Sequence, residues 1–293
     1  RGTMTIDPQK LLAAPPAEVP FSYAARDTML HGLGIGLGMD PLDTAQLPFV
    51  YEDGAPLQVF PTQSTVLGWV DLLRDARFAD PAWGVDPNKM VVGDLVFRTR
   101  KPLPVAGEGL ARSYFAEIVD KGKGKAALLR VRKEVLLGDE IVATLDTWLF
   151  VRAAGGFGGQ VAGGPARVLL PVRAPDAVCD LPTPQNLALL FRLSLGDHNA
   201  LHADPEHAQR VGFERPILHG IANFSIGVHA ALQGLLDYDA SAVAGGQARM
   251  SGPVFPGDTL RNELWREGDT VLFRTRAVER DAPVMDGGSI DLV

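Results

Sequence analysis

The chain has 293 residues, of which 46% are hydrophobic and 22% charged, a composition typical of a soluble globular protein. Its 28 Lys and Arg residues are outnumbered by 35 Asp and Glu residues, and the net charge of -7 argues against nonspecific nucleic-acid binding. The single cysteine, Cys179, excludes an internal disulfide and a cysteine-rich zinc site. No run approaches the roughly 18 uncharged apolar residues that span a bilayer, so we expect no membrane partner and a cytoplasmic location.

Four runs rich in β-branched and aromatic residues predict an antiparallel meander in the first half. The connections between them are too short for crossover helices. The runs cover residues 90–101, 110–120, 126–137 and 140–152.

A glycine-rich stretch follows the meander, and it is too rich in glycine to form a helix or a central strand. It lacks the Gly-Lys-Ser/Thr ending of a phosphate-binding loop, so we interpret it as a linker. We therefore predict an N-terminal domain over residues 4–154, a linker over 155–165 and a C-terminal domain over 166–293.

The second half is predicted to contain a strand, then two helices, then several short strands with hairpin spacing. Helices precede a run of antiparallel strands in each half, which indicates the α+β class. The predicted strands are 167–173, 247–251, 259–267, 270–279 and 283–293, and the predicted helices are 183–193 and 219–236.

Two weak internal matches at nearly one offset suggest a duplicated unit. Residues 92–95 resemble 256–260, and residues 30–37 resemble 190–197. Where the second copy has Asp197 and His202, the first has leucines, so we expect the chemistry in the C-terminal half and a pocket-lining role for the N-terminal half.

Five of the six histidines lie between His198 and His229, in a segment that also holds Asp197 and Asn199. Asp197 and His202 are five positions apart, which would separate them by about 140° on an ideal helix. They converge only if the backbone turns, and the glycine and asparagine around them favour a turn. A converging carboxylate and imidazole can hold a water molecule and move its protons, and the Asn199 amide can orient it.

His219 and Gly220 open an apolar helix after Pro216. The first N–H groups of a helix lack internal partners and carry partial positive charge. The Gly220 N–H is therefore a candidate donor to an oxygen that gains negative charge. We interpret His219 as a helix-start or packing residue more readily than as a catalytic one.

The segment from Phe191 through residues 197–202 closely resembles the hydratase 2 motif of MaoC-like (R)-specific enoyl-CoA hydratases. The similarity extends along nearly the whole chain, in the order of the hydratase unit of peroxisomal multifunctional enzyme type 2. It also covers residues 101–104, 120–122, 155–159, 216–220 and 254–258.

This resemblance implies a tandem (double) hotdog fold, in which each half wraps an antiparallel sheet around a long central helix. It implies hydration of trans-2-enoyl-CoA to (3R)-3-hydroxyacyl-CoA, with an acyl-CoA substrate, no metal, no redox cofactor and a homodimeric assembly. The implied catalytic residues are Asp197, His202, Asn199 and Gly220. The implied residues lining the CoA and acyl site are Gly93, Lys121, His198, Ala200, Leu201 and Met250.

The chain departs from the family pattern at four places. Leu195 is an extra residue before Gly196, and Ala200 replaces the usual proline. Val92 and Met250 stand where the multifunctional enzymes have a histidine and an aromatic residue. These changes concern the catalytic loop and the contacts to CoA or the acyl chain, and they leave the reacting groups in place.

Hydration has four alternatives. A metal site is disfavoured, because the spacing of His198, His202 and His207 does not repeat at i, i+4 on a clear helix and no HExxH occurs. A serine nucleophile is disfavoured because no G-x-S-x-G elbow occurs. A carboxylate-based hotdog acyl-CoA thioesterase and a noncatalytic acyl-CoA-binding module stay open.

Overall fold

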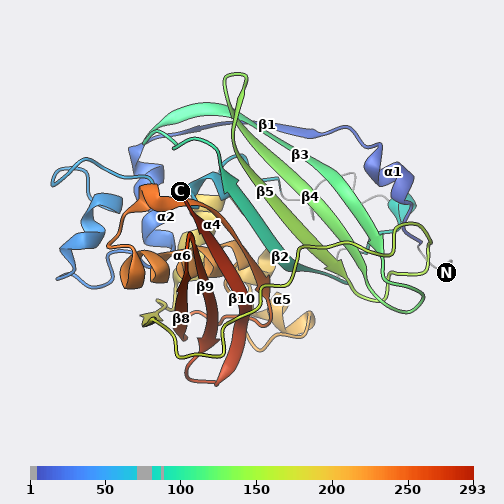
Figure 1. Cartoon of the computed structure of the whole chain (residues 1–293). Helices are drawn as coiled ribbons and strands as arrows, with labels where there is room; N and C mark the ends of the chain where they lie inside the picture. Colours follow the sequence, from blue (N-terminus) through green and yellow to red (C-terminus); the bar gives the residue numbers. More distant parts are fainter. Residues whose placement is uncertain (1–4, 71–80, 87–88) are drawn as a thin grey trace.

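The computed structural model describes residues 5–70, 81–86 and 89–293, and within them ten strands form one antiparallel sheet (Figure 1). The strand order is β1-β3-β4-β5-β2-β7-β10-β9-β8-β6. The first five strands are Ala17–Tyr23, Met90–Thr99, Gly107–Asp120, Ala127–Leu137 and Glu140–Val151. The last five, β6 to β10, are Ala177–Pro182, Val243–Met250, Thr259–Glu267, Thr270–Ala277 and Ala282–Leu292.

The strand order repeats between the two halves of the chain. From its outer edge the first half has β1-β3-β4-β5-β2, and the second half has β6-β8-β9-β10-β7. The two innermost strands, β2 and β7, pair with each other and join the halves. This duplicated order confirms the α+β class and the tandem hotdog architecture.

The helices occupy the concave side of the sheet and its edges (Figure 1). The α-helices are α1 Pro8–Leu12, α2 Ala25–Gly34, α4 Leu187–Leu195, α5 Pro205–Arg210 and α6 Gly220–Leu235. Short 3-10 helices cover Thr44–Phe49, Gln63–Thr65, Pro81–Trp83, Ala200–His202 and Ala240–Ala242.

Helix α6 is the central helix of the C-terminal half. Every residue from Ile221 to Leu232 is buried, and the helix packs against β6, β8, β9 and β10. A helix that is apolar on all sides is stable only when its whole circumference is covered, which the curved sheet achieves here. The long central helix expected for the N-terminal half is not among the described residues of that half, and residues 71–80 lie outside them.

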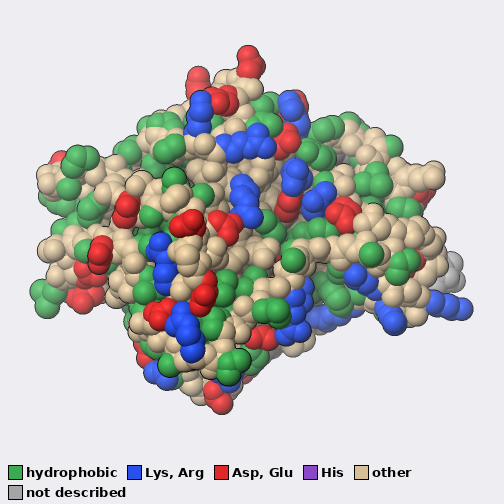
Figure 2. Space-filling view, in the orientation of Figure 1, with side chains coloured by type: hydrophobic (Ala, Val, Ile, Leu, Met, Phe, Trp, Pro, Cys, Tyr) green, Lys and Arg blue, Asp and Glu red, His purple; other side chains and the backbone are tan. Residues whose placement is uncertain are grey.

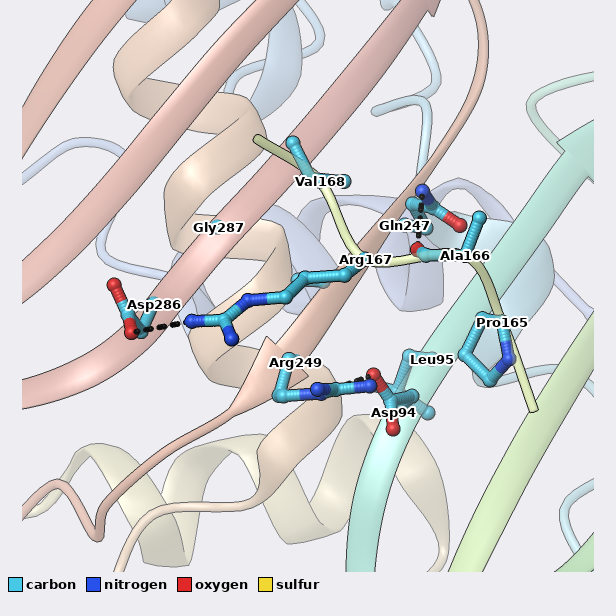
Figure 3. A pocket seen from close by; sticks show the side chains of 11 residues that line it. Asp94, Leu95, Pro165, Ala166, Arg167, Val168, Gln247, Arg249, Asp286 and Gly287 are labelled. Atoms are coloured by element: carbon cyan, nitrogen blue, oxygen red, sulfur yellow. Dashed lines mark hydrogen bonds and ion pairs between the residues drawn. The ribbon is translucent and has the colours of Figure 1, made fainter. Parts of the chain in front are cut away.

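The prediction of a strand over residues 167–173 is wrong. This segment pairs with no strand of the described chain, and Leu169 and Val172 are exposed. Prolines at 165 and 171 remove two backbone donors, which disfavours pairing. The backbone just before this segment, at Pro165 and Ala166, lies over β2 and β7 (Figure 3). There the Gln247 side chain donates to the Ala166 carbonyl at 3.4 Å.

Of the two internal matches, one is correct and one is wrong. Residues 30–37 and 190–197 fall on α2 and α4, which follow the first strand of their halves and pack against each other. Residues 92–95 lie in β2, whereas 256–260 lead into β8, whose counterpart in the repeated order is β3. The match between residues 92–95 and 256–260 is therefore a coincidence of composition.

Charged side chains of both signs are interspersed over the face seen in Figure 2. This face offers no broad basic surface of the kind that binds nucleic acid. Within the described part of the chain, every helix falls short of the length and apolar character needed to cross a membrane.

Candidate active site

The end of α4 turns sharply and presents Asp197. Gly196 adopts a left-handed conformation with φ of 73°, and its N–H donates to the Arg192 carbonyl at 2.8 Å. Only glycine adopts this backbone conformation without steric cost, so Gly196 ends the helix. The Asp197 side chain then accepts a hydrogen bond from the Asn199 N–H at 3.1 Å.

Asn199 builds the next turn. Its Oδ1 accepts a hydrogen bond from the Leu201 N–H at 3.0 Å and caps the 3-10 turn Ala200–His202. This turn brings His202 back toward Asp197, as the sequence predicted. The Asn199 oxygen is thus engaged in the backbone, which leaves the amide NH2 group for contacts with a bound molecule.

The His202 ring is fixed by its Nδ1 atom, which lies 2.7 Å from the Ile217 carbonyl oxygen. A carbonyl only accepts, so Nδ1 carries the hydrogen and Nε2 of the neutral ring carries a lone pair. Nε2 lies 3.9 Å from Asp197 Oδ2, and the two side chains are only 12% and 6% exposed. Two proton acceptors therefore face each other without a hydrogen between them.

His219 is a third member of this cluster. Its Nε2 lies 3.1 Å from Asp197 Oδ2, although the angle falls outside that of a hydrogen bond. Its ring stacks on the His202 ring, with centroids 3.7 Å apart. Its sequence position predicts a packing or helix-start role, and His219 does precede α6, but it also contacts the carboxylate directly.

A cavity of about 430 Å³ opens beside the cluster, within the size range of small-molecule sites. Both halves of the molecule form its walls. Its border includes six of the predicted site residues: Asp197, Asn199, Leu201, His202, Gly220 and Met250.

The other predicted site residues lie away from the lining of this cavity. Gly93 forms a β-bulge in β2, next to Val92, which does line it. Lys121 donates to the Gly163 carbonyl at 3.2 Å, and His198 is exposed. Ala200 is half-buried in the 3-10 turn. Their roles toward CoA stay predictions.

The amide of Gly220 faces the cavity at the start of α6. No described backbone or side-chain acceptor takes its N–H. A Cβ at this position would lie 3.6 Å from Met250 Sδ and 3.7 Å from Val92 Cγ1, and both residues line the cavity. A free helix N-terminal donor thus borders the same space as Asp197 and His202.

The charge states of the cluster follow from burial and mutual contact. Burial, with a smaller contribution from the neighbouring His219, lowers the pKa of His202 to about 3. Burial alone would raise the pKa of Asp197, but the contacts with His219 and the Asn199 N–H outweigh it and lower that pKa below its usual value. At neutral pH the site therefore holds a carboxylate and a neutral imidazole.

Acid pH is expected to destabilise the fold through its buried histidines. Burial lowers the pKa of His31 and His202 to about 3 and that of His229 to about 4. Below pH 6.5 the unfolded chain binds protons that the folded chain does not, so stability falls as pH falls. At pH 5 the loss is about 2 kcal/mol for each histidine. Urea unfolding at pH 7 and pH 5 measures it, and equal stability at both would show that these rings are solvated.

The cluster does not suit a metal ion, although one ligand atom from each of Asp197, His202 and His219 lies within 4.8 Å of the others. The two imidazole rings are stacked with only 22° between their planes. An imidazole nitrogen binds a metal ion through a lone pair in the plane of its ring, but an ion bound to both Nε2 atoms would lie well out of the plane of at least one of these rings.

The duplicated sheet, the covered α6 and the polar cluster at its start define a double-hotdog protein with a MaoC-like second half. Residues 169–287 match the family model described as MaoC like domain. Residues 21–153 match the model described as MFE-2 hydratase 2 N-terminal domain.

Known proteins show the same similarity along the chain. It is 35% identical to the enoyl-CoA hydratase ChsH3 of Mycobacterium tuberculosis, over 99% of both chains. It is 34% identical to peroxisomal multifunctional enzyme type 2 of Mus musculus, over 93% of this chain but only 37% of that enzyme. A crystal structure of a MaoC-like dehydratase from Phytophthora capsici superimposes with a TM-score of 0.86, at 30% identity over 98% of each chain. The chain therefore belongs to the MaoC-like hydratase 2 family.

Proposed function

We propose that this protein adds water reversibly to trans-2-enoyl-CoA, giving (3R)-3-hydroxyacyl-CoA, with Asp197 and His202 as the groups that activate the water. One observation carries the proposal. Two proton acceptors, Asp197 Oδ2 and His202 Nε2, lie 3.9 Å apart at the border of a cavity that the free Gly220 N–H also borders.

A water molecule between the two acceptors donates one hydrogen to each. Its hydrogen bonds then direct a lone pair of the water oxygen away from the protein and into the cavity. As the oxygen bonds to C3 of the substrate, one acceptor takes up the proton that leaves it. The electron pair of the C2=C3 bond moves toward the thioester carbonyl. C2 then receives a proton from one of the two side chains, Asp197 or His202, on the same face of the substrate.

The thioester oxygen gains negative charge in this step. The Gly220 N–H, at the positive end of the α6 dipole, donates to that oxygen and stabilises the enolate. Because glycine has no side chain, the carbonyl can approach the amide closely. His219 stacks on the His202 ring and contacts the same carboxylate oxygen, Asp197 Oδ2, which restrains the carboxylate. Asn199 shapes the turn that presents His202.

An assay of the intact protein with crotonyl-CoA tests the function. A hydratase removes the enoyl absorbance and yields (3R)-3-hydroxybutyryl-CoA, identified by chiral chromatography, without releasing a thiol. Release of free CoA, detected with a thiol reagent, would indicate the thioesterase alternative. Binding without any turnover would indicate the noncatalytic acyl-CoA-binding alternative.

Replacing Gly220 by Ala is expected to reduce kcat/KM by about 10², because one oxyanion donor contributes roughly that much or more. The added methyl group would sit at ordinary contact distance from Met250 and Val92 and would block the carbonyl from the amide. Alanine suits the first turn of a helix, so the fold should be retained. Steady-state kinetics with a thermal unfolding control measure the effect, and an unchanged kcat/KM would remove Gly220 from the mechanism.

Several expectations from the sequence stay predictions. They are the domain limits at residues 4–154, 155–165 and 166–293, the homodimer, the cytoplasmic location and the independence from metal and redox cofactors. Size-exclusion chromatography with light scattering measures the assembly, and activity after dialysis against a chelator measures the metal independence.

A further inference from the structure

A buried lysine lines the cavity in the half of the molecule that carries no proposed catalytic residue. Lys133 of β4 is 5% exposed and shares the cavity wall with the active-site cluster. Its Nζ donates to the carbonyl oxygens of Thr65, at 2.6 Å, and Leu67, at 3.0 Å. In the described part of the chain, no carboxylate forms an ion pair with it.

The wall around Lys133 is mostly aliphatic but has a polar patch. Ser113 of β3 is the direct cross-strand neighbour of Lys133, and both line the cavity. Thr147 of β5 pairs with Val131, two residues from Lys133 on the same face of β4. The Trp69 indole N–H is buried without an acceptor in the same lining. We call Trp69, Ser113, Lys133 and Thr147 the distal patch.

The distal patch is too far from the reacting atoms to take part in hydration. Val92 of β2 contacts the Gly220 end of the cavity, while Lys133 is on β4, two strands away. Lys133 pairs with Leu145 of β5, and Leu145 in turn pairs with Phe97 of β2. Phe97 is five positions along β2 from Val92. The offset is about 10 Å across the strands and about 15 Å along them. Lys133 is therefore placed to meet the far part of an acyl chain.

Burying an amine in such a wall costs folding free energy unless each of its N–H donors has an acceptor. An ammonium group has three donors, and the two carbonyl oxygens take only two of them. Burial without a compensating carboxylate lowers the pKa of Lys133 to about 7. An alkyl chain offers nothing to the remaining position, whereas a ligand oxygen fills it. Methionine or leucine would serve a purely apolar chain better.

We infer that Lys133 is a specificity-determining residue that selects acyl-CoA substrates whose acyl group carries an oxygen function, such as a hydroxyl or a carboxylate, far from the thioester. The inference rests on the proposed function for the position of the thioester. It assigns the distal patch to the substrate and gives Lys133 no role in the chemical step.

The test compares pairs of trans-2-enoyl-CoA substrates of equal chain length, with and without a terminal carboxylate or hydroxyl, over a series of lengths. At the length that reaches Lys133, the wild-type kcat/KM should favour the oxygenated substrate about ten- to a hundredfold, the range for a hydrogen bond to a charged group. Lys133→Met should reduce this ratio toward one. Lys101→Met, at an exposed surface ion pair with Glu140, is the matched control and should retain the ratio.

The two substituents separate the sources of the effect, since a preference for the carboxylate alone would indicate charge pairing and a preference for both would indicate hydrogen bonding. Equal wild-type rates on both members of every pair would overturn the inference, as would an unchanged ratio in Lys133→Met. The wild-type comparison decides the question even if that variant fails to fold. Crotonyl-CoA is too short to reach Lys133 and reports the proposed function separately. If it is not hydrated, calorimetric affinities for the saturated acyl-CoA pairs test Lys133 by the same ratio.

Discussion

Asp197→Asn is expected to lower kcat for enoyl-CoA hydration by about 10² to 10⁴, the usual loss when an acid or base is removed. Asparagine has the same shape, so the turn built by Gly196 and Asn199 should survive. Its amide cannot accept a proton from water, and its NH2 group would compete with the water hydrogens. Single-turnover and steady-state rates with crotonyl-CoA measure the loss.

Asp204→Asn is the matched control for this variant. Asp204 is on the same loop, but its side chain caps α5 by accepting from the Glu206 and His207 N–H groups. Asparagine caps a helix equally well, so this variant should retain wild-type rates and stability. Near-normal turnover in a folded Asp197→Asn protein would remove the carboxylate from the mechanism.

His202→Gln is expected to cause a loss of similar size. Glutamine can still donate to the Ile217 carbonyl, but it has no basic nitrogen to place beside Asp197 Oδ2. Because both groups act on one water molecule, the double variant with Asp197→Asn should be only slightly slower than either single variant. The rates of all three proteins, measured together, give this non-additivity.

His207→Gln in α5 is the control for removal of a nearby histidine, and it should keep its activity. If the losses in the double variant instead multiplied, Asp197 and His202 would act in separate steps. The shared-water arrangement would then be incorrect.

Much of the fold is predictable from local sequence signals. The four strands of the meander, the central helix α6 and the last three strands follow the alternation and composition of their residues. Strands β1 and β6 were missed because each is an edge strand that pairs on one side and contains proline. The run at 167–173 has strand composition, but Pro165 precedes it and Pro171 interrupts it, and it pairs with no strand of the described chain.

The active site was only partly predictable. The Asp197–His202 pairing required a backbone turn, which the glycine and asparagine signalled. The contact of His219 with Asp197 joins two elements that are 22 residues apart, and no local pattern reveals it. The sequence did indicate that His219 lies near the site, because His219 immediately precedes the predicted donor Gly220. Lys133 also had a sequence signal, because it occupies an alternating position with Leu129, Val131 and Val135 in a predicted strand, where the pattern calls for an apolar residue.

A crystal structure of the Asp197→Asn protein bound to a trans-2-enoyl-CoA would test the arrangement of the site most directly. We expect the thioester oxygen within hydrogen-bond distance of the Gly220 amide, and C3 facing the side chains at 197 and 202. An acyl group bound outside this cavity, or a thioester turned away from Gly220, would contradict the proposed mechanism.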